Sequence, residues 1–136
     1  MISLKATLKA ITTSIKALSV DYIVEQGTSG IWTYRKWNSG IAECWGTKTL
    51  TFSITSSWGN AYDGYGLKEG ISYPTGLFIE NPTLVIGANN SESGFMFKHW
   101  SGTNGSSTKT PSIMGARPTS GSFSATVCLR AIGKGK

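Results

Sequence analysis

The first part of the chain has a helical pattern of apolar positions. Apolar side chains recur at alternating intervals of four and three residues, at Leu4, Leu8, Ile11, Ile15 and Leu18. This is the 3.5-residue repeat of a coiled coil. A single helix of this length is marginally stable in water, so we expect the stripe to pack either on the sheet that follows or on other copies of the chain. No second helical pattern follows, which favours self-association.

Beyond residue 21 the pattern changes to alternation of apolar and polar residues, broken by turn residues. About seven or eight short segments have this period-two pattern. The clearest are residues 31–37, 41–47, 49–54 and 121–133. The sequence therefore predicts a mainly β chain, an antiparallel β-sandwich or jelly-roll-like head preceded by a short N-terminal coiled-coil helix.

Residues 31–47, "IWTYRKWNSGIAECWGT", predict a hairpin with aromatic side chains on both faces. Asn38-Ser39-Gly40 is a typical hairpin connection. Because alternate residues of a strand face opposite sides, Trp32 lies on one face and Trp37 on the other, while Trp45 shares a face of the second strand with Ile41 and Glu43. A hairpin that is apolar on both faces needs cover on both, so we expect it to be sandwiched.

Two polar segments are candidates for recognition. Residues 56–70 predict a long loop or irregular hairpin, and residues 101–112 predict a loop. Flat aromatic rings beside Asn and Asp can stack on sugars and accept hydrogen bonds from hydroxyls, although the same residue types also close the end of a small sandwich. The candidate ligand-binding residues are Trp58, Asn60, Tyr62, Asp63, Tyr65, Trp100 and Asn104.

Charge and cysteine content narrow the choice of partners. The net charge is +6, which permits nucleic acid or an anionic glycan, but the lysines are spread singly and a basic solvated surface is the simpler interpretation. Cys44 and Cys128 have no metal-ligand spacing, and we expect free buried thiols, although a disulfide is arithmetically possible.

The sequence gives no pattern of an enzyme. His99 is the only histidine, and no nucleophile, phosphate-binding or metalloprotease motif is present. The few carboxylates have no spacing that suggests a glycosidase pair. We therefore predict a non-catalytic protein without cofactor or metal. Lys5, Lys9 and Lys16 interrupt the N-terminal apolar positions, so we expect neither a signal peptide nor a membrane span.

Three segments resemble one known family. They are "DYIVEQGTSGIWTYRKWNSGIAECWGT" (21–47), "YPTGLFIENPTL" (73–84) and "LRAIGKGK" (129–136). These resemble the C-terminal head, or receptor-binding, domain of tail-fibre and minor tail proteins of phages and prophages that infect Gram-positive bacteria. The pattern W…RKW.SG..ECWG is the most specific part. The family commonly ends in Trp-Lys after its Ile-Gly, whereas this chain ends in Gly133-Lys134-Gly135-Lys136.

The resemblance implies a parallel homotrimer in which a stalk leads into a β-sandwich head that binds host cell-wall or capsular carbohydrate. It implies a helical trimerisation stub at 1–20, an aromatic neck hairpin at 21–48 and a head at 49–136. It also places the protein in the virion, at the tail tip or fibre, with the rest of the phage tail as partner and assembly in the host bacterial cytoplasm. The expected trimer interface consists of Leu4, Leu8, Ile11, Ile15, Leu18, Trp32, Trp37 and Trp45.

Two other functions stay open at this point. One is a purely structural trimerising knob that caps a fibre without a ligand. The other is a single-stranded nucleic-acid binder that uses basic charge and stacked aromatics. The scattered lysines make the nucleic-acid binder the weaker of the two.

Overall fold

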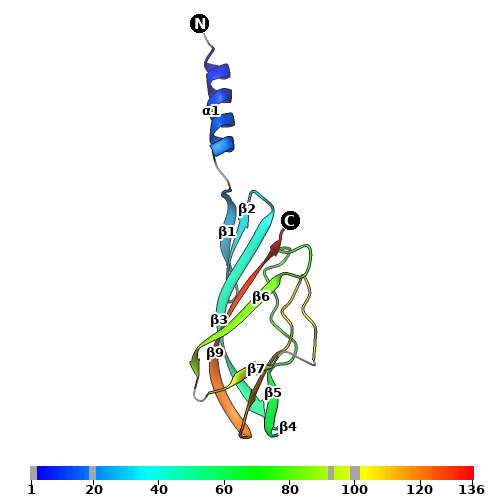
Figure 1. Ribbon diagram of the computed structural model, residues 1–136. Coiled ribbons are helices and arrows are strands. Elements are labelled where there is room, and N and C mark those ends of the chain that lie inside the picture. The colour runs from blue at the N-terminus through cyan, green and yellow to red at the C-terminus, as the bar shows by residue number, and fades with distance from the viewer. Residues whose placement is uncertain (1–2, 19–20, 92–93, 99–101) are drawn as a thin grey trace.

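The computed structural model describes residues 3–18, 21–91, 94–98 and 102–136 of the chain. In this part of the chain one helix precedes nine strands (Figure 1). The elements are α1 (Leu4–Leu18), β1 (Ile23–Ser29), β2 (Trp32–Trp37), β3 (Ile41–Ile54), β4 (Ser56–Trp58), β5 (Ala61–Leu67), β6 (Thr83–Ser91), β7 (Met96–Lys98), β8 (Ile113–Arg117) and β9 (Gly121–Lys134).

The strands form two antiparallel sheets. The first has the order β1-β2-β3-β9-β6 and the second the order β4-β5-β8-β7. The prediction of a mainly β, antiparallel chain with one N-terminal helix is confirmed. The arrangement is sandwich-like, but it has five strands against four, whereas a jelly roll has eight strands in all.

Strands β3 and β9 are the longest strands of the first sheet, with 14 residues each. They pair along their whole length, from Ile41 opposite Lys134 to Ile54 opposite Gly121. The alternation predicted for residues 49–54 and 121–133 is confirmed, because their apolar positions are buried in one core. These core residues are Leu50, Phe52, Ile54, Phe123, Ala125, Val127, Leu129 and Ala131.

Glycine lets the second sheet approach β3 closely. A Cβ atom on Gly64 would lie 1.7 Å from the carbonyl oxygen of Ser53, and one on Gly66 would lie 2.5 Å from the Phe52 ring. Phe52 in turn stacks on Phe123 with ring centroids 5.1 Å apart. The glycines of "YDGYG" therefore set the inner face of β5 against the core.

Near α1 the inner face of the first sheet is covered by the irregular segment 68–82 instead of a strand layer. Tyr73 packs on Trp32 with ring centroids 5.5 Å apart, and the Trp32 Nε1–H donates to the carbonyl oxygen of Ser72 at 2.7 Å. Trp32 is only 3% exposed in its own chain, so almost no indole surface is left for a neighbouring subunit. This corrects its placement: Trp32 is a core residue, whereas Trp37 and Trp45 lie half-buried on the opposite side of the sheet.

The predicted neck hairpin is part of the first sheet. Strand β3 continues across the expected boundary between residues 48 and 49, and its first residues pair with β9. Gly30, with φ of +59°, turns the chain between β1 and β2, and residues 27–29 belong to β1. We therefore describe residues 21–136 as one β body.

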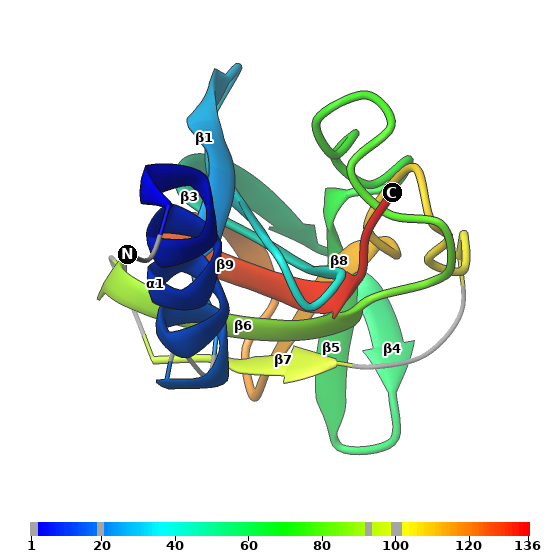
Figure 2. The ribbon, with the colours of Figure 1, turned by 90° about the horizontal axis from the view of Figure 1, so that it is seen from above.

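Helix α1 lies outside the two layers of strands (Figures 1 and 2). The Ser3 hydroxyl accepts a hydrogen bond from the Ala6 N–H and caps the helix at its start. Leu4, Leu8 and Ile11 are 75%, 55% and 51% exposed, so the described part of the apolar stripe is not docked on the sheet. The side chains of Ile15 and Leu18 lie outside the described residues. No helix in the described part of the chain is long and apolar enough to cross a membrane.

Candidate ligand-binding groove

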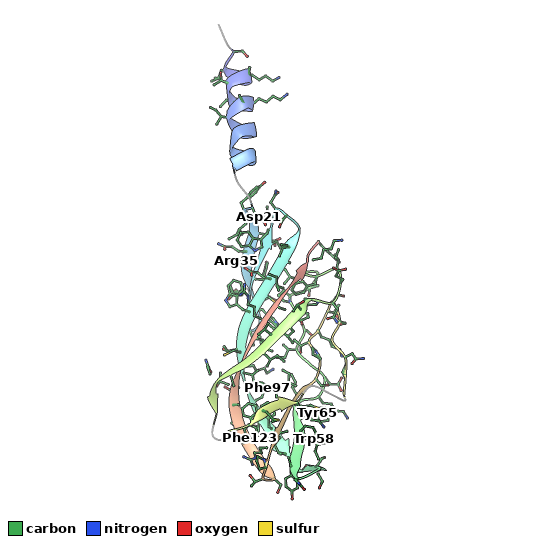
Figure 3. All side chains as sticks on the ribbon, viewed as in Figure 1. Asp21, Arg35, Trp58, Tyr65, Phe97 and Phe123 are labelled. Carbon is green, nitrogen blue, oxygen red and sulfur yellow. The ribbon has the colours of Figure 1, made fainter. Side chains whose placement is uncertain are left out.

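The β4–β5 hairpin forms the end of the molecule farthest from α1, and it carries Trp58 (Figure 3). Trp58 pairs with Ala61 across a two-residue turn in which Gly59 has φ of +62°. A left-handed backbone at this position is natural for glycine. Residues 56–67 of the segment predicted as a loop or irregular hairpin thus form a regular hairpin, and Trp58 is 47% exposed.

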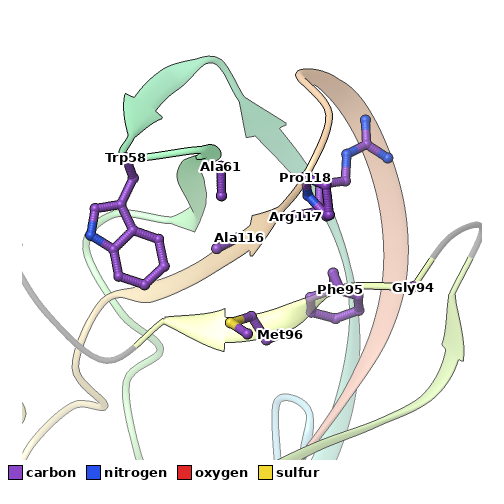
Figure 4. A pocket seen from close by; sticks show the side chains of 8 residues that line it. All are labelled: Trp58, Ala61, Gly94, Phe95, Met96, Ala116, Arg117 and Pro118. Atoms are coloured by element: carbon purple, nitrogen blue, oxygen red, sulfur yellow. The ribbon is translucent and has the colours of Figure 1, made fainter.

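A groove of about 420 Å³ lies beside this indole, between the hairpin and strands β7 and β8 (Figure 4). Ala116 lies opposite Asp63 on one side and Met96 on the other, and its short, buried side chain leaves room above the sheet. Met96 is well exposed. The lining residues are Trp58, Ala61, Gly94, Phe95, Met96, Ala116, Arg117 and Pro118.

An ion pair beside the groove positions the Trp58 indole. The Lys98 ammonium pairs with the Asp63 carboxylate, and only 10% of each side chain is exposed. The Lys98 Nζ also lies 4.7 Å from the centroid of the Trp58 ring, a cation–π distance. Asp63 therefore supports the indole through Lys98 and does not present a free carboxylate to a ligand, which corrects its predicted role.

Arg117 fixes the turn at the other rim of the groove. Its Nε–H donates to the carbonyl oxygen of Thr119 at 2.9 Å, and its guanidinium carbon lies 4.9 Å from the centroid of the Phe123 ring. These contacts hold the segment that carries Pro118. A second hollow, of about 380 Å³, adjoins the groove and is lined by Trp58, Gly59, Asn60, Ala61 and Pro118. The indole is thus shared by two hollows, one apolar and one beside an exposed amide.

The other predicted ligand residues lie elsewhere. Tyr62 belongs to the opposite face of the second sheet and packs against the core. Tyr65 is half-buried near Lys68, whose Nζ lies 6.0 Å from its ring centroid. Asn104 is exposed in the loop before β8 and does not line the groove. Trp100 and His99 lie outside the described residues. The predicted set thus contributes Trp58 and Asn60 directly and Asp63 indirectly.

Both cysteines are free thiols. Cys44 is buried, and loss of hydration raises its pKa to about 12, with backbone hydrogen bonding opposing the shift and the nearby Glu43 charge adding to it. Cys128 is half-buried on the outer side of β9. The prediction of free thiols is confirmed, and burial is complete only for Cys44.

The groove residues have no arrangement suited to metal binding. Among the residues that the structure describes, no three His, Cys, Asp or Glu side chains lie close enough together to hold an ion. What the groove offers is an indole, a thioether, a proline and small side chains, with one exposed amide next to it. No protein-family model, curated protein or solved structure matches this chain.

Proposed function

We propose that this chain is the head of a phage tail fibre, which assembles as a parallel homotrimer and binds host cell-surface carbohydrate. One observation carries the proposal. The molecule has, at one end, a helix whose described apolar stripe is exposed, and, at the opposite end, an indole-lined groove (Figure 3). This is the arrangement that a fibre needs, since attachment and recognition must occur at different ends.

The helix supports the oligomeric part of the proposal. A 15-residue helix with an exposed apolar stripe is marginal by itself, and a 3.5-residue repeat buries its stripe against equivalent helices. Parallel helices would point three heads the same way. Weak sites on the three heads would then act together, because each bound site raises the effective concentration of the other two.

The groove supports the ligand part of the proposal. Ligand sites are concave and mostly apolar, with a few placed polar groups, and the two hollows that share Trp58 have this character. The apolar C–H face of a pyranose fits a flat indole, and the Asn60 amide can exchange hydrogen bonds with its hydroxyls. Because Lys98 and Asp63 already hold the indole, little side-chain entropy is lost on binding.

Binding of purified host cell-wall and capsular polysaccharides to the full chain tests the ligand proposal. We expect the substitution Trp58→Ala to weaken binding at least about tenfold, as expected for a central aromatic contact, and Asn60→Ala to weaken it less. Asn104→Ala is the matched control for Asn60→Ala, since Asn104 is exposed but outside the groove. Unchanged affinity of the Trp58→Ala variant would refute this groove as the site.

A structural knob without a ligand is the second candidate. It is favoured by the fact that Tyr62 and Asp63, two of the residues expected to bind sugar, serve the fold instead. A glycan array separates the two candidates, because a knob would assemble as a trimer and yet bind no polysaccharide. Retention on single-stranded DNA that falls steeply with salt would instead favour the nucleic-acid binder.

A further inference from the structure

In the part of the chain that the structure describes, the outer face of the first sheet has no layer packed on it. The second sheet and segment 68–82 cover only its inner face. On the outer face, at the end nearest α1, exposed aliphatic side chains come from four of the five strands. They are Ile23, Ile41, Val85 and Ile132.

Two diagonal pairs lie at the centre of this apolar surface. The Arg35 guanidinium carbon lies 5.0 Å from the centroid of the Trp45 ring, and the Arg130 Nη2 donates to the Glu43 Oε2 at 2.9 Å (Figure 3 labels Arg35). The four side chains surround a hollow of about 380 Å³. Glu43 is buried although it lies on this outer side, because the neighbouring long side chains cover it.

The composition of this face is that of a protein interface. Tryptophan and arginine are enriched where proteins meet, and they contribute most to binding when surrounded by apolar contacts that exclude water. A sheet face that stays in solvent normally has polar residues at alternate positions. The outer face follows that rule far from α1, where Thr49 and Thr126 hydroxyls pair across the strands and Thr51 pairs with Ser124. In the half near α1, the apolar side chains Ile41, Trp45, Val85 and Ile132 take outward positions among polar ones such as Thr33, Thr83 and Lys134.

We propose that the half of this face nearest α1, defined by Ile41, Trp45, Val85, Arg130 and Ile132, packs against the neighbouring copies of this chain in the assembled protein. The proposal rests on the trimer in the proposed function, and it names the surface by which the β bodies meet. It also assigns the outer side of the aromatic hairpin, Trp37 and Trp45, to that interface.

The connection to α1 supports another copy of the chain as the occupant. Packed helices have axes about 8–10 Å apart, so association through α1 brings the β1 ends of different copies close together. The start of the β body is tied to the hairpin, since Asp21 accepts hydrogen bonds from the Ser39 N–H at 3.0 Å and from the Ser39 hydroxyl. The Asn38 N–H donates to the Tyr22 carbonyl oxygen at 2.8 Å. The apolar half of the face begins at this same end.

A pair of isoleucine substitutions in the full chain tests the surface. Ile132 and Ile79 are 39% and 47% exposed, and only Ile132 lies on the outer face. We expect Ile132→Glu to weaken association at least about tenfold in sedimentation velocity over a concentration series, with an unchanged circular dichroism spectrum. Ile79→Glu adds the same charge and should assemble like the unaltered chain.

Each outcome has a distinct meaning. Equal association of the Ile132→Glu and Ile79→Glu variants would overturn the assignment of this face while leaving the trimer intact. If the unaltered chain is itself a monomer, the proposed function fails together with the interface. If circular dichroism shows that the Ile132→Glu variant is misfolded, the reactivity of the Cys128 thiol in the unaltered chain tests the surface instead.

Cys128 is a native reporter of the same surface. It lies on the outer side of β9, opposite Thr47 on one neighbouring strand and Gly87 on the other, whereas Cys44 is buried. With Ellman's reagent we expect one thiol per chain to react, at least about tenfold more slowly in the concentrated assembly than after dilution to single chains. The same reaction rate at both concentrations would contradict the proposed packing.

Discussion

Two of the hairpins, β2–β3 and β4–β5, each place a tryptophan under a cation, but in different surroundings. In the hairpin of β2 and β3, the Arg35 guanidinium lies over Trp45, and in the distal region the Lys98 ammonium lies over Trp58. Trp45 lies within a five-stranded sheet, with Thr33 and Arg130 as its cross-strand neighbours. Trp58 lies at the end of an edge strand beside a turn.

This difference in position determines what each tryptophan can contact. Because strand β3 has a neighbouring strand on each side, Trp45 lies within a broad sheet face, and such a face suits contact with another protein surface. Trp58 has a neighbour on one side only and stands next to the short side chains of Ala61 and Ala116, which leaves a groove. Grooves suit small ligands. We infer that strand position, more than residue type, separates the surface proposed for assembly from the groove proposed for recognition.

The largest expected effect contrasts Trp32 with Trp45. Trp32→Ala removes a buried indole and its hydrogen bond to Ser72, which should lower the free energy of unfolding by about 3–5 kcal/mol. Trp45→Ala should cost less in the single chain but should abolish trimer formation at micromolar concentration. Urea unfolding and native mass spectrometry of both variants measure the two effects. Equal effects of both variants on both quantities would remove the distinction between core and interface.

A smaller effect is expected from the Lys98–Asp63 ion pair, which positions the Trp58 indole. Lys98→Met keeps an unbranched apolar side chain but removes the ammonium that pairs with Asp63 and lies over Trp58. We expect polysaccharide affinity to fall several-fold, since one cation–π contact contributes about 0.5–2 kcal/mol, and stability to fall because the buried Asp63 loses its partner. Trimer formation should not change. A variant with full affinity would show that Lys98 does not position the indole.

The smallest effect concerns pH at the junction between α1 and the β body. Hydrogen bonds from Ser39, followed by one from the Tyr22 N–H, hold the pKa of Asp21 below its ordinary value of 3.8. A lowered pKa means that the ionised carboxylate stabilises the folded state above the ordinary pKa, and that this contribution is lost as the pH falls through the lowered value. Asp21→Asn should therefore lower the melting temperature slightly at neutral pH, and this difference should shrink as the pH falls below the ordinary pKa of 3.8.

The partner of this contact gives a second measurement. Ser39→Ala removes the hydroxyl donor to Asp21 and should reduce the same pH dependence. A melting-temperature difference that stays constant from neutral pH to about pH 3 would show that the Asp21 charge has no part in it.

The sequence predicted strands well where one face is buried and the other exposed. Strand β9 alternates along its length, because its inner residues fill the core and its outer residues do not. Strand β8, with the sequence IMGAR, was not predicted, because residues 113–116 are all buried in the second sheet and no alternation results. Burial on both sides removes the period-two signal.

The candidate groove was only partly predictable. Trp58 and Asn60 stand out locally, as an aromatic and an amide beside a glycine turn. Met96, Ala116 and Pro118 carry no such signal, because they reach the groove only through the pairing of β7 with β8. The role of Asp63 depends on Lys98, 35 residues later in the chain, and no local pattern indicates that pairing.

Native mass spectrometry of the full chain at micromolar concentration tests the central claim most directly. The claim is that neighbouring copies of this chain cover the apolar stripe of α1 and the half of the outer sheet face nearest α1. It predicts a species of three chains that is lost on Leu8→Glu and kept on Ala10→Glu, since Leu8 belongs to the stripe and Ala10 is exposed outside it. A folded single chain as the only species would contradict the account.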